Sequence, residues 1–139
     1  MYRALAWLIA AMLVAGCAST STPAPSTGGA SQTPSMAGTV SVADAAVLRD
    51  DGAIIVDVRE PDEWAAGHIP GAILIPLGEL PSRLGDVPPN RPIVVVCRSG
   101  NRSAQGRDIL IGAGFPAVTS LDGGMNDWEV AGLPIETGE

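Results

Sequence analysis

Short apolar runs alternate with segments of helical pattern over residues 39–139 of the chain. Two runs, Ala53–Val58 (AIIVDV) and Ile93–Cys97 (IVVVC), are rich in β-branched residues and apolar on both faces. This pattern is typical of strands that lie buried inside a parallel sheet. Ala72–Ile75 and Ala117–Leu121 are weaker strand candidates of similar size. The apolar pattern therefore predicts the strands of one sheet.

Helix signals fall around and between these runs. The expected helices are Val42–Asp50, Pro61–Ala65 with proline at its first position, Leu77–Leu84, and Ser103–Ala113, which stops at a Gly-Ala-Gly sequence. Because strands and helices alternate with short connections, we predict an α/β domain with a mainly parallel, twisted sheet flanked by helices on both faces. In such sheets the ligand-binding crevice lies at the carboxyl ends of the strands. Residues that follow a strand are therefore the first candidates for a functional site.

The N-terminal residues have a different pattern. Residues 1–16 begin with Met-Tyr-Arg and continue into an uninterrupted apolar run that is short for a bilayer span, which is typical of a signal peptide. Leu13–Cys17 (LVAGC) resembles the lipobox of bacterial lipoproteins, in which the cysteine is lipidated and becomes the first mature residue. The alternative is an ordinary cleavage site with Cys17 left free. We expect a lipoprotein signal peptide and lipidation of Cys17.

Residues 17–38 predict a disordered tether. After Cys17 they consist almost entirely of Ala, Ser, Thr, Pro and Gly, so they cannot bury a core. As a flexible coil they would span roughly 25 Å. The expected organisation is a signal peptide over residues 1–16, a lipidated tether over 17–38 and one domain over 39–139. The expected location is the cell envelope outside the cytoplasm, on the periplasmic side of an outer membrane or on the outer face of a plasma membrane.

Charge and composition narrow the expected partners. All eight basic residues are arginines, and they face fifteen acidic residues, for a net charge of −7. This balance argues against nucleic acid or an anionic lipid surface as partner, because both need clustered positive charge. The expected membrane contact is through the lipid anchor only. One histidine and one cysteine besides Cys17 do not make a metal ligand set, so neither a metal nor another cofactor is expected.

The second cysteine, Cys97, ends a predicted strand and enters a tight loop before a predicted helix. Main-chain N–H groups and the positive end of a helix dipole stabilise anions, so the thiolate, which is the nucleophile, should be favoured here. Gly100 can adopt the positive φ that such a loop needs, and Asn101 tolerates it. Arg98 and Arg102 would add positive charge beside the sulfur. The alternative is that Cys97 is a small hydrophobic residue that completes a strand.

Three segments carry a family resemblance: Ile54–Pro76 (IIVDVREPDEWAAGHIPGAILIP), Ile93–Ala104 (IVVVCRSGNRSA) and Ser120–Ile135 (SLDGGMNDWEVAGLPI). Over residues 42–135 the chain resembles a single rhodanese domain, the sulfurtransferase module. The resemblance implies that Cys97 takes a sulfane sulfur from thiosulfate or an organic persulfide. The enzyme would hold this sulfur as a Cys97 persulfide and pass it to cyanide or to an acceptor thiol.

The resemblance also implies which residues surround the sulfur. The main-chain amides around the sulfur would come from an active-site loop made of Arg98, Ser99, Gly100, Asn101 and Arg102. Two-domain thiosulfate sulfurtransferases carry a basic residue at the position of Ser99 and a second arginine near that of Glu63. Two cationic contacts are therefore missing here, which disfavours thiosulfate as the physiological donor.

Residues outside the loop have supporting roles in this interpretation. We expect Asp57, at a strand end, to pair with Arg98 and hold the loop, and the alternative is that it caps the turn that follows. Arg59 and Glu63 are spaced to pair across one helical turn. His68 is the only histidine, and the resemblance assigns it an architectural role rather than that of a catalytic base.

Further expectations concern bulky residues and a turn. Trp64 and Trp128 are expected to anchor the core, and Gly123-Gly124 to form a turn.

Two other functions stay open on the sequence. Rhodanese-like phosphatases and arsenate reductases use a loop that is one residue longer, whereas only four residues separate Cys97 from Arg102. The chain could also be a sulfur carrier or binding module without turnover of its own. If Cys17 is lipidated, Cys97 has no resolving cysteine in its own chain, so a persulfide must be discharged by another molecule. The expected partners are thus a small sulfur donor and an external thiol, either a small molecule or a protein.

Overall fold

The computed structural model describes Met36 and residues 38–138 of the 139-residue chain. The predicted signal peptide, the lipidation at Cys17 and nearly all of the predicted tether lie outside these residues. Across the part that the structure describes, no helix combines the length and the apolar character that a membrane crossing needs.

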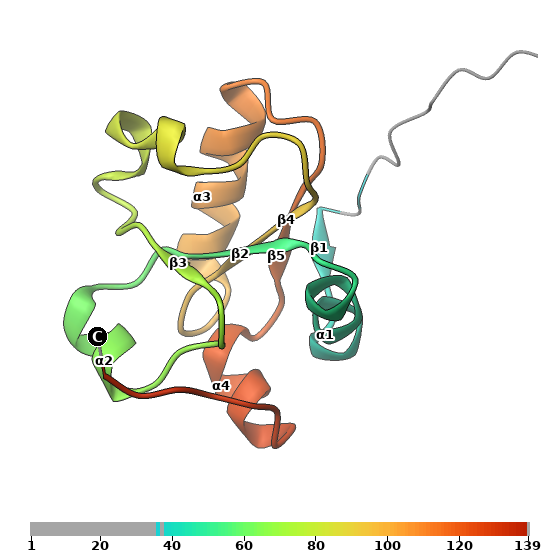
Figure 1. The fold of residues 1–139 in the computed structure, drawn as a ribbon, viewed down its shortest axis with the longest axis vertical. Helices are drawn as coiled ribbons and strands as arrows, with labels where there is room; N and C mark the ends of the chain where they lie inside the picture. Colours follow the sequence, from blue (N-terminus) through green and yellow to red (C-terminus); the bar gives the residue numbers. More distant parts are fainter. Residues whose placement is uncertain (1–35, 37, 139) are drawn as a thin grey trace, which may run out of the picture. The chain divides into compact units, whose positions relative to one another are not determined.

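Five strands form one parallel sheet in the described residues, with the order β1-β5-β4-β2-β3 (Figure 1). The strands are β1 (Thr39–Val40), β2 (Ile54–Asp57), β3 (Ile73–Leu74), β4 (Ile93–Val96) and β5 (Val118–Leu121). The prediction of a parallel sheet is confirmed. The four strands expected from apolar runs are all present, and β1 is an additional, two-residue edge strand.

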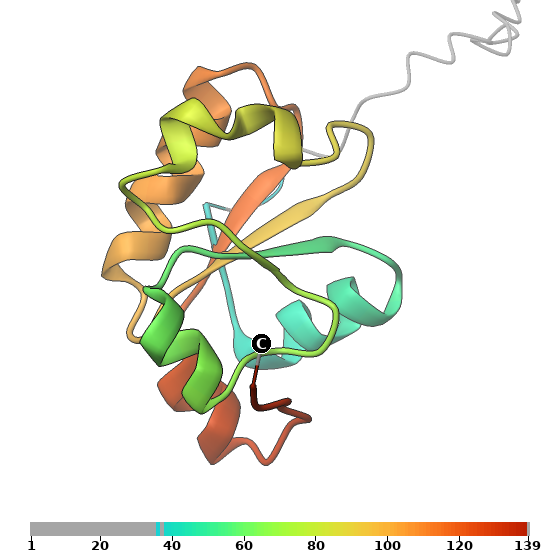
Figure 2. The same cartoon turned by 60° about the vertical axis from the view of Figure 1, so that its left-hand side comes forward.

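Helices cover both faces of this sheet, as predicted (Figures 1 and 2). The helices and 3-10 turns are α1 (Val42–Asp50), α2 (Pro61–Ala66), η1 (Leu80–Ser82), η2 (Leu84–Asp86), α3 (Asn101–Gly112) and α4 (Gly124–Val130). α1 and α4 pack on one face, and α3 lies on the other together with the two 3-10 turns.

The core divides between the two faces because successive residues of a strand point in opposite directions. On β4, Val95 packs on the face of α3, whereas Val94 and Val96 pack on the face of α1 and α4. All residues of β2, β4 and β5 are buried, which explains the apolar runs of β2 and β4, whereas β5 also buries the polar residues Thr119 and Ser120.

The register brings two strand ends together at the same edge of the sheet. Asp57, the last residue of β2, lies opposite Val96, the last residue of β4. The loops that follow these strands therefore start side by side, and Cys97 is the first residue of one of them.

Two segments differ from the sequence prediction. The helix expected over Leu77–Leu84 is replaced by the two 3-10 turns η1 and η2. Pro81 lacks an N–H group, and Gly78 and Gly85 weaken a helix at either side, so only short turns form. The second difference is α4, which had no strong sequence signal because it has only seven residues.

Gly106 lets α3 pack closely on the sheet. A Cβ atom at this position would lie 3.0 Å from Val95 Cγ1 and 3.2 Å from Val58 Cγ1. The close approach helps to hold the N-terminus of α3 beside Cys97, where the candidate site lies.

Candidate active site around Cys97

Cys97 lies between β4 and the loop that leads into α3. The residue is only 1% exposed, yet its sulfur faces the loop: the Gly100 N–H donates to Cys97 Sγ at 3.1 Å. Gly100 has a φ of 99°, as predicted, and this conformation turns its amide toward the sulfur. Ser103 Oγ, from the first turn of α3, lies 3.6 Å from Sγ. Loop and helix thus form a shallow cradle around one sulfur atom.

This environment favours the thiolate. Burial raises the pKa of the Cys97 thiol, but the hydrogen bond with the Ser103 hydroxyl and those with the amides of Ser103, Ser99 and Gly100 outweigh burial and lower it. The sequence-based expectation of an activated thiol is therefore supported by named donors. Sequence reasoning assigned no role to Ser103. The available signal was its position, six residues after the cysteine in the first turn of the predicted helix.

The N-terminus of α4 holds the outer side of the loop. The Met125 N–H donates to the Cys97 carbonyl at 2.8 Å, and the Asn126 N–H donates to the Arg98 carbonyl at 3.1 Å. Gly124 has a φ of 61°, and a Cβ atom there would collide with the Arg98 carbonyl oxygen at 2.6 Å. Gly123 and Gly124 were predicted to form a turn, but they are the N-cap and the first residue of α4, and their positive φ allows this close contact with the loop.

Arg98 in the loop and Arg102 bind one carboxylate, that of Glu63 on α2. Asn101 and Arg102 were predicted to lie in the loop but belong to the first turn of α3. Arg98 Nε donates to Glu63 Oε1 at 3.0 Å. Arg102 makes a bidentate pair with the same group, with Nη1 to Oε2 at 2.7 Å and Nη2 to Oε1 at 2.8 Å. The Arg102 hydrogen bond, assisted by the Glu60 amide and Arg98, lowers the pKa of Glu63 to about 2 against the effect of burial. Glu63 therefore offsets much of the positive charge that we expected beside the sulfur.

The predicted pairing of Asp57 with Arg98 is wrong. Asp57 instead forms a buried ion pair with Arg59, with Arg59 Nη2 at 2.7 Å from Asp57 Oδ2. Asp57 also accepts the Arg59 main-chain N–H at 3.0 Å, so the alternative that it caps the following turn is confirmed. The Arg59 guanidinium thus occupies the Asp57 carboxylate, and Arg98 pairs with Glu63 instead.

Arg59 connects this strand end to α2. Its Nη2 donates to the Gly67 carbonyl at 2.8 Å, and its Nη1 donates to the Glu63 carbonyl at 3.2 Å. The expected pairing of Arg59 with Glu63 thus occurs through the main chain and not through the carboxylate. Arg59 is 3% exposed and its donors are occupied by protein groups, so we assign it the role of holding α2 against the end of β2.

His68 takes part in fold contacts, as the architectural interpretation predicts. Its ring stacks on Trp64 with centroids 3.6 Å apart, and its Nδ1 lies 3.1 Å from the Trp64 carbonyl oxygen. Trp64 itself is only half-buried, so the prediction that it anchors the core is wrong. The corresponding prediction for Trp128 is confirmed because this side chain is fully buried.

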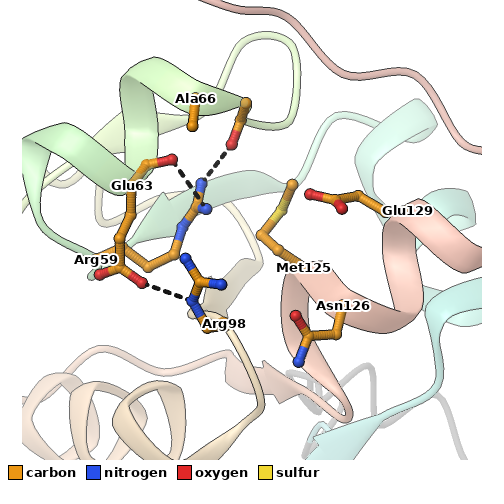
Figure 3. Close-up of a pocket in the computed structure, with 8 residues that line it drawn as sticks. Arg59, Glu63, Ala66, Arg98, Met125, Asn126 and Glu129 are labelled. Atoms are coloured by element: carbon orange, nitrogen blue, oxygen red, sulfur yellow. Dashed lines mark hydrogen bonds and ion pairs between the residues drawn. The ribbon is translucent and has the colours of Figure 1, made fainter.

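A cavity of about 250 Å³ lies beside the loop, between α2 and α4 (Figure 3). Its lining residues are Arg59, Glu63, Ala66, Gly67, Arg98, Met125, Asn126 and Glu129. Arg98 immediately follows the candidate nucleophile, so the cavity adjoins the cradle without enclosing the sulfur. Over residues 38–138, no cluster of three or more His, Cys, Asp or Glu side chains is placed to hold a metal ion.

Comparisons with known proteins agree with this fold. The profile of the Rhodanese-like domain family matches residues 41–131. A protein of Allochromatium vinosum named "Sulfurtransferase" is 42% identical over 82 residues, which cover 59% of this chain and 77% of that protein. The "Thiosulfate sulfurtransferase GlpE" of Pseudomonas entomophila is 37% identical over 100 residues, which cover 72% and 91% of the two chains.

A solved structure supports the same assignment. The rhodanese-related protein of Thermoplasma volcanium superposes with a TM-score of 0.66 at 30% identity, covering 70% of this chain and 96% of that one. The parallel sheet, the cysteine at a strand end and its amide cradle define a rhodanese-like α/β domain. This chain belongs to the rhodanese-like domain family, whose relatives include sulfurtransferases.

Proposed function

We propose that this protein is a membrane-tethered, extracytoplasmic sulfurtransferase that carries sulfur on Cys97. The observation that carries the proposal is the cradle: main-chain amides and the Ser103 hydroxyl lower the pKa of a thiol at the mouth of a short loop. A thiolate attacks sulfur, and donors already aimed at its position need no rearrangement when negative charge moves onto or off the sulfur.

The proposed reaction has two displacement steps. In the first, the Cys97 thiolate attacks the sulfane sulfur of the donor, a new S–S bond forms, and the donor leaves with the electron pair of its broken bond to sulfur. In the second, an acceptor thiolate or cyanide attacks the outer sulfur, and Cys97 leaves as a thiolate. Each step exchanges one bond to sulfur for another, so no external oxidant or reductant is needed.

The charges near Cys97 favour an organic persulfide over thiosulfate as donor. A dianion gains most from guanidinium groups that are free to contact it. Arg102 binds Glu63 through both terminal nitrogens and Arg98 binds it through Nε, at 2.7 to 3.0 Å, so this carboxylate already offsets part of their positive charge. A donor with less negative charge at its reacting end depends less on free guanidinium groups, so this site disfavours it less than it disfavours a dianion.

A sulfur-carrier role is the second candidate. Cys97 is the only cysteine in the described residues, so a persulfide on it has no neighbouring thiol that would release the sulfur. A carrier would load in the same way but would need a partner protein for discharge. Phosphatase or arsenate reductase chemistry is less favoured, because four intervening residues leave a cradle sized for one sulfur atom.

The proposal also includes the cellular location of the protein. We infer from the apolar run before the LVAGC sequence that Cys17 is lipidated and that residues 18–38 tether the domain outside the cytoplasm. Multiple acyl chains hold a protein on a membrane far more firmly than a single chain.

Intact mass analysis tests the chemistry. The full chain is incubated separately with thiosulfate, 3-mercaptopyruvate and glutathione persulfide, and we expect the gain of one sulfur atom, most completely with the persulfide. Cys97→Ser, which keeps the size of the side chain but lacks the thiol, should gain none. If no donor modifies the native chain, or if the serine variant is modified equally, the sulfurtransferase proposal is wrong. Discharge by a small thiol then separates an enzyme from a carrier that needs a protein partner.

A further inference from the structure

The cavity beside the loop contains polar groups that the proposed sulfur chemistry does not use. In the region that the structure describes, the side-chain amide of Asn126 and the carboxylate of Glu129 make no hydrogen bond or ion pair. Arg98 pairs with Glu63 through Nε, and its two terminal nitrogens make no hydrogen bond to any described residue. By contrast, Arg59 and Glu63 in the same wall are fully engaged with other protein groups. The cavity thus offers the two free guanidinium nitrogens of Arg98, whose Nε binds Glu63, together with one unpaired carboxylate and one neutral amide.

These groups come from two different elements. Arg98 extends from the active-site loop, whereas Asn126 and Glu129 lie one turn apart on α4 (Figure 3). The main chain holds the two elements together through the bond from the Asn126 N–H to the Arg98 carbonyl. The backbones that carry the two charged groups are therefore held side by side by the same contacts that hold the loop.

A ligand that matches this pattern carries both charges. A carboxylate would be bound by the free guanidinium nitrogens of Arg98, and an ammonium group by the Glu129 carboxylate, with the Asn126 amide available to either. Ala66, Gly67 and Met125 provide the apolar part of the wall. Small-molecule sites commonly combine an apolar wall with a few such convergent polar groups. The zwitterionic end of an amino acid has this chemistry.

The position of the cavity indicates where the sulfur of such a ligand lies. Arg98 follows Cys97 in the chain, but Cys97 itself is not part of the cavity wall. A head group bound here is separated from the reacting sulfur, so the two must be several bonds apart in the ligand. A volume of about 250 Å³ accommodates such a head group.

We propose that the cavity lined by Arg98, Asn126 and Glu129 binds the zwitterionic end of a small thiol and directs its sulfur to Cys97. This inference rests on the proposed sulfur transfer and names the class of the acceptor. The acceptor thiolate attacks the outer sulfur of the Cys97 persulfide, the acceptor S–S bond forms, and the Cys97 S–S bond breaks with its electrons on Sγ. The products are the acceptor persulfide and the free Cys97 thiolate.

Binding is tested first, without any reaction. S-Methylglutathione has a zwitterionic end and no free thiol, and its N-acetyl derivative lacks the ammonium group. By isothermal titration calorimetry with the full chain, we expect N-acetylation to weaken binding about two- to fivefold, as for a partly exposed ion pair. In Glu129→Gln this difference should vanish. Glu79→Gln removes an equal charge from an exposed site away from the cavity and should keep the difference.

Kinetics provide the second readout. We compare kcat/KM for sulfur transfer to glutathione with that for 2-mercaptoethanol, and the ratio should fall about two- to fivefold in Glu129→Gln and further in Glu129→Lys. Glu129 is exposed, so both variants are expected to fold. Using a ratio removes any general effect on the persulfide.

The outcomes separate the two proposals. If Cys97 loads with sulfur and the ratio is unchanged in both variants, the cavity assignment is wrong and the sulfurtransferase proposal stands. If Cys97 never loads but binding depends on Glu129 as described, the cavity assignment stands and the sulfurtransferase proposal is wrong. If N-acetylation has no effect on binding to the native chain, the cavity does not recognise an ammonium group.

Discussion

Among the single residues of the site, Cys97 has its pKa lowered by two kinds of hydrogen-bonding group, main-chain amides and one side-chain hydroxyl. Main-chain amides of the loop are present whatever side chains it carries, whereas the Ser103 hydroxyl depends on one residue type. Ser103 Oγ accepts from the Cys97 thiol at 3.6 Å and donates to the Gly100 carbonyl at 2.8 Å, so it lies between the loop and the sulfur. A single hydroxyl therefore contributes both to the shape of the cradle and to its preference for negative charge.

Replacing this hydroxyl should make the thiol harder to ionise. In Ser103→Ala, burial still raises the pKa of Cys97 while one of the opposing hydrogen bonds is lost, so we expect the pKa to rise. The pH dependence of alkylation by iodoacetamide measures this as a shift of the rate profile to higher pH. Ser99→Ala removes another hydroxyl of the loop but keeps the amide, so its profile should stay near that of the native chain. Equal rate profiles for Ser103→Ala and the native chain would show that the Ser103 hydroxyl does not lower the pKa of Cys97.

Residue-scale predictions from sequence succeeded where the cause is local. The positive φ of Gly100 and the favoured thiolate at Cys97 follow from a strand, a tight loop and a helix that are adjacent in the chain. The partner of Arg98 could not be predicted in this way, because Glu63 lies 35 residues earlier in the sequence. Two carboxylates, Asp57 and Glu63, lay within the same short segment, and only the direction of the chain after β2 decides between them.

At the scale of elements, Glu63 connects α2 to the active-site loop and to the first turn of α3. Its carboxylate is 14% exposed and receives both arginines, which makes this contact a network rather than a single surface pair. Such networks contribute more than isolated exposed ion pairs. The orientation of α2 over the site therefore depends on an ionised Glu63.

Acid should weaken this connection. The folded-state pKa of Glu63 is about 2 and its ordinary value is 4.5, so its contribution to stability is complete above about pH 4.5 and is lost as the pH falls toward 2. We expect Glu63→Gln to be less stable than the native chain at pH 7 and to lose less stability over this pH interval. Thermal unfolding followed by circular dichroism at each pH measures both effects. The control Glu79→Gln removes a carboxylate that is exposed, so its stability should depend on pH as that of the native chain does. If the stability of all three proteins had the same pH dependence, the role assigned to Glu63 would be contradicted.

Sequence patterns predicted the buried elements better than the short ones. β2 and β4 have four buried residues each, so their apolar runs were clear. α4 has seven residues and begins at two glycines with positive φ, and neither feature resembles a strong helix signal. It is nevertheless α4 that holds the loop carbonyls and provides one wall of the cavity. The element with the weakest sequence signal thus contributes directly to the candidate site.

At the scale of the whole molecule, the proposal combines a reactive domain with a membrane tether. The carbonyl of Gly38, at the end of the predicted tether, accepts hydrogen bonds from Arg107 at 2.7 Å and from the Ser120 amide at 3.2 Å. The domain is thus fastened to its N-terminal segment at β1 and β5. The cavity and the cradle lie elsewhere, at the carboxyl ends of the strands.

Lipidation at Cys17 should decide where the chain is found. In a bacterial host grown with labelled palmitate, we expect the native chain to incorporate the label and to fractionate with membranes. Cys17→Ser should incorporate none and leave the membrane fraction, because no acyl chain can then be attached. Cys97→Ser should behave like the native chain, which separates lipidation from sulfur chemistry. Label on Cys17→Ser would show that the anchor is elsewhere.

The α/β class, the parallel sheet and the place of Cys97 at a strand end could be predicted from the chain alone, because periodicity and strand-loop-helix order are local properties. Which charges meet at the site depends on the three-dimensional fold. Glu63 reaches Arg102 across 39 residues, and Asn126 reaches Arg98 from a helix that is distant in sequence. Such contacts depend on how turns orient whole elements in space, and the direction of a turn is not encoded in the period of the residues on either side of it.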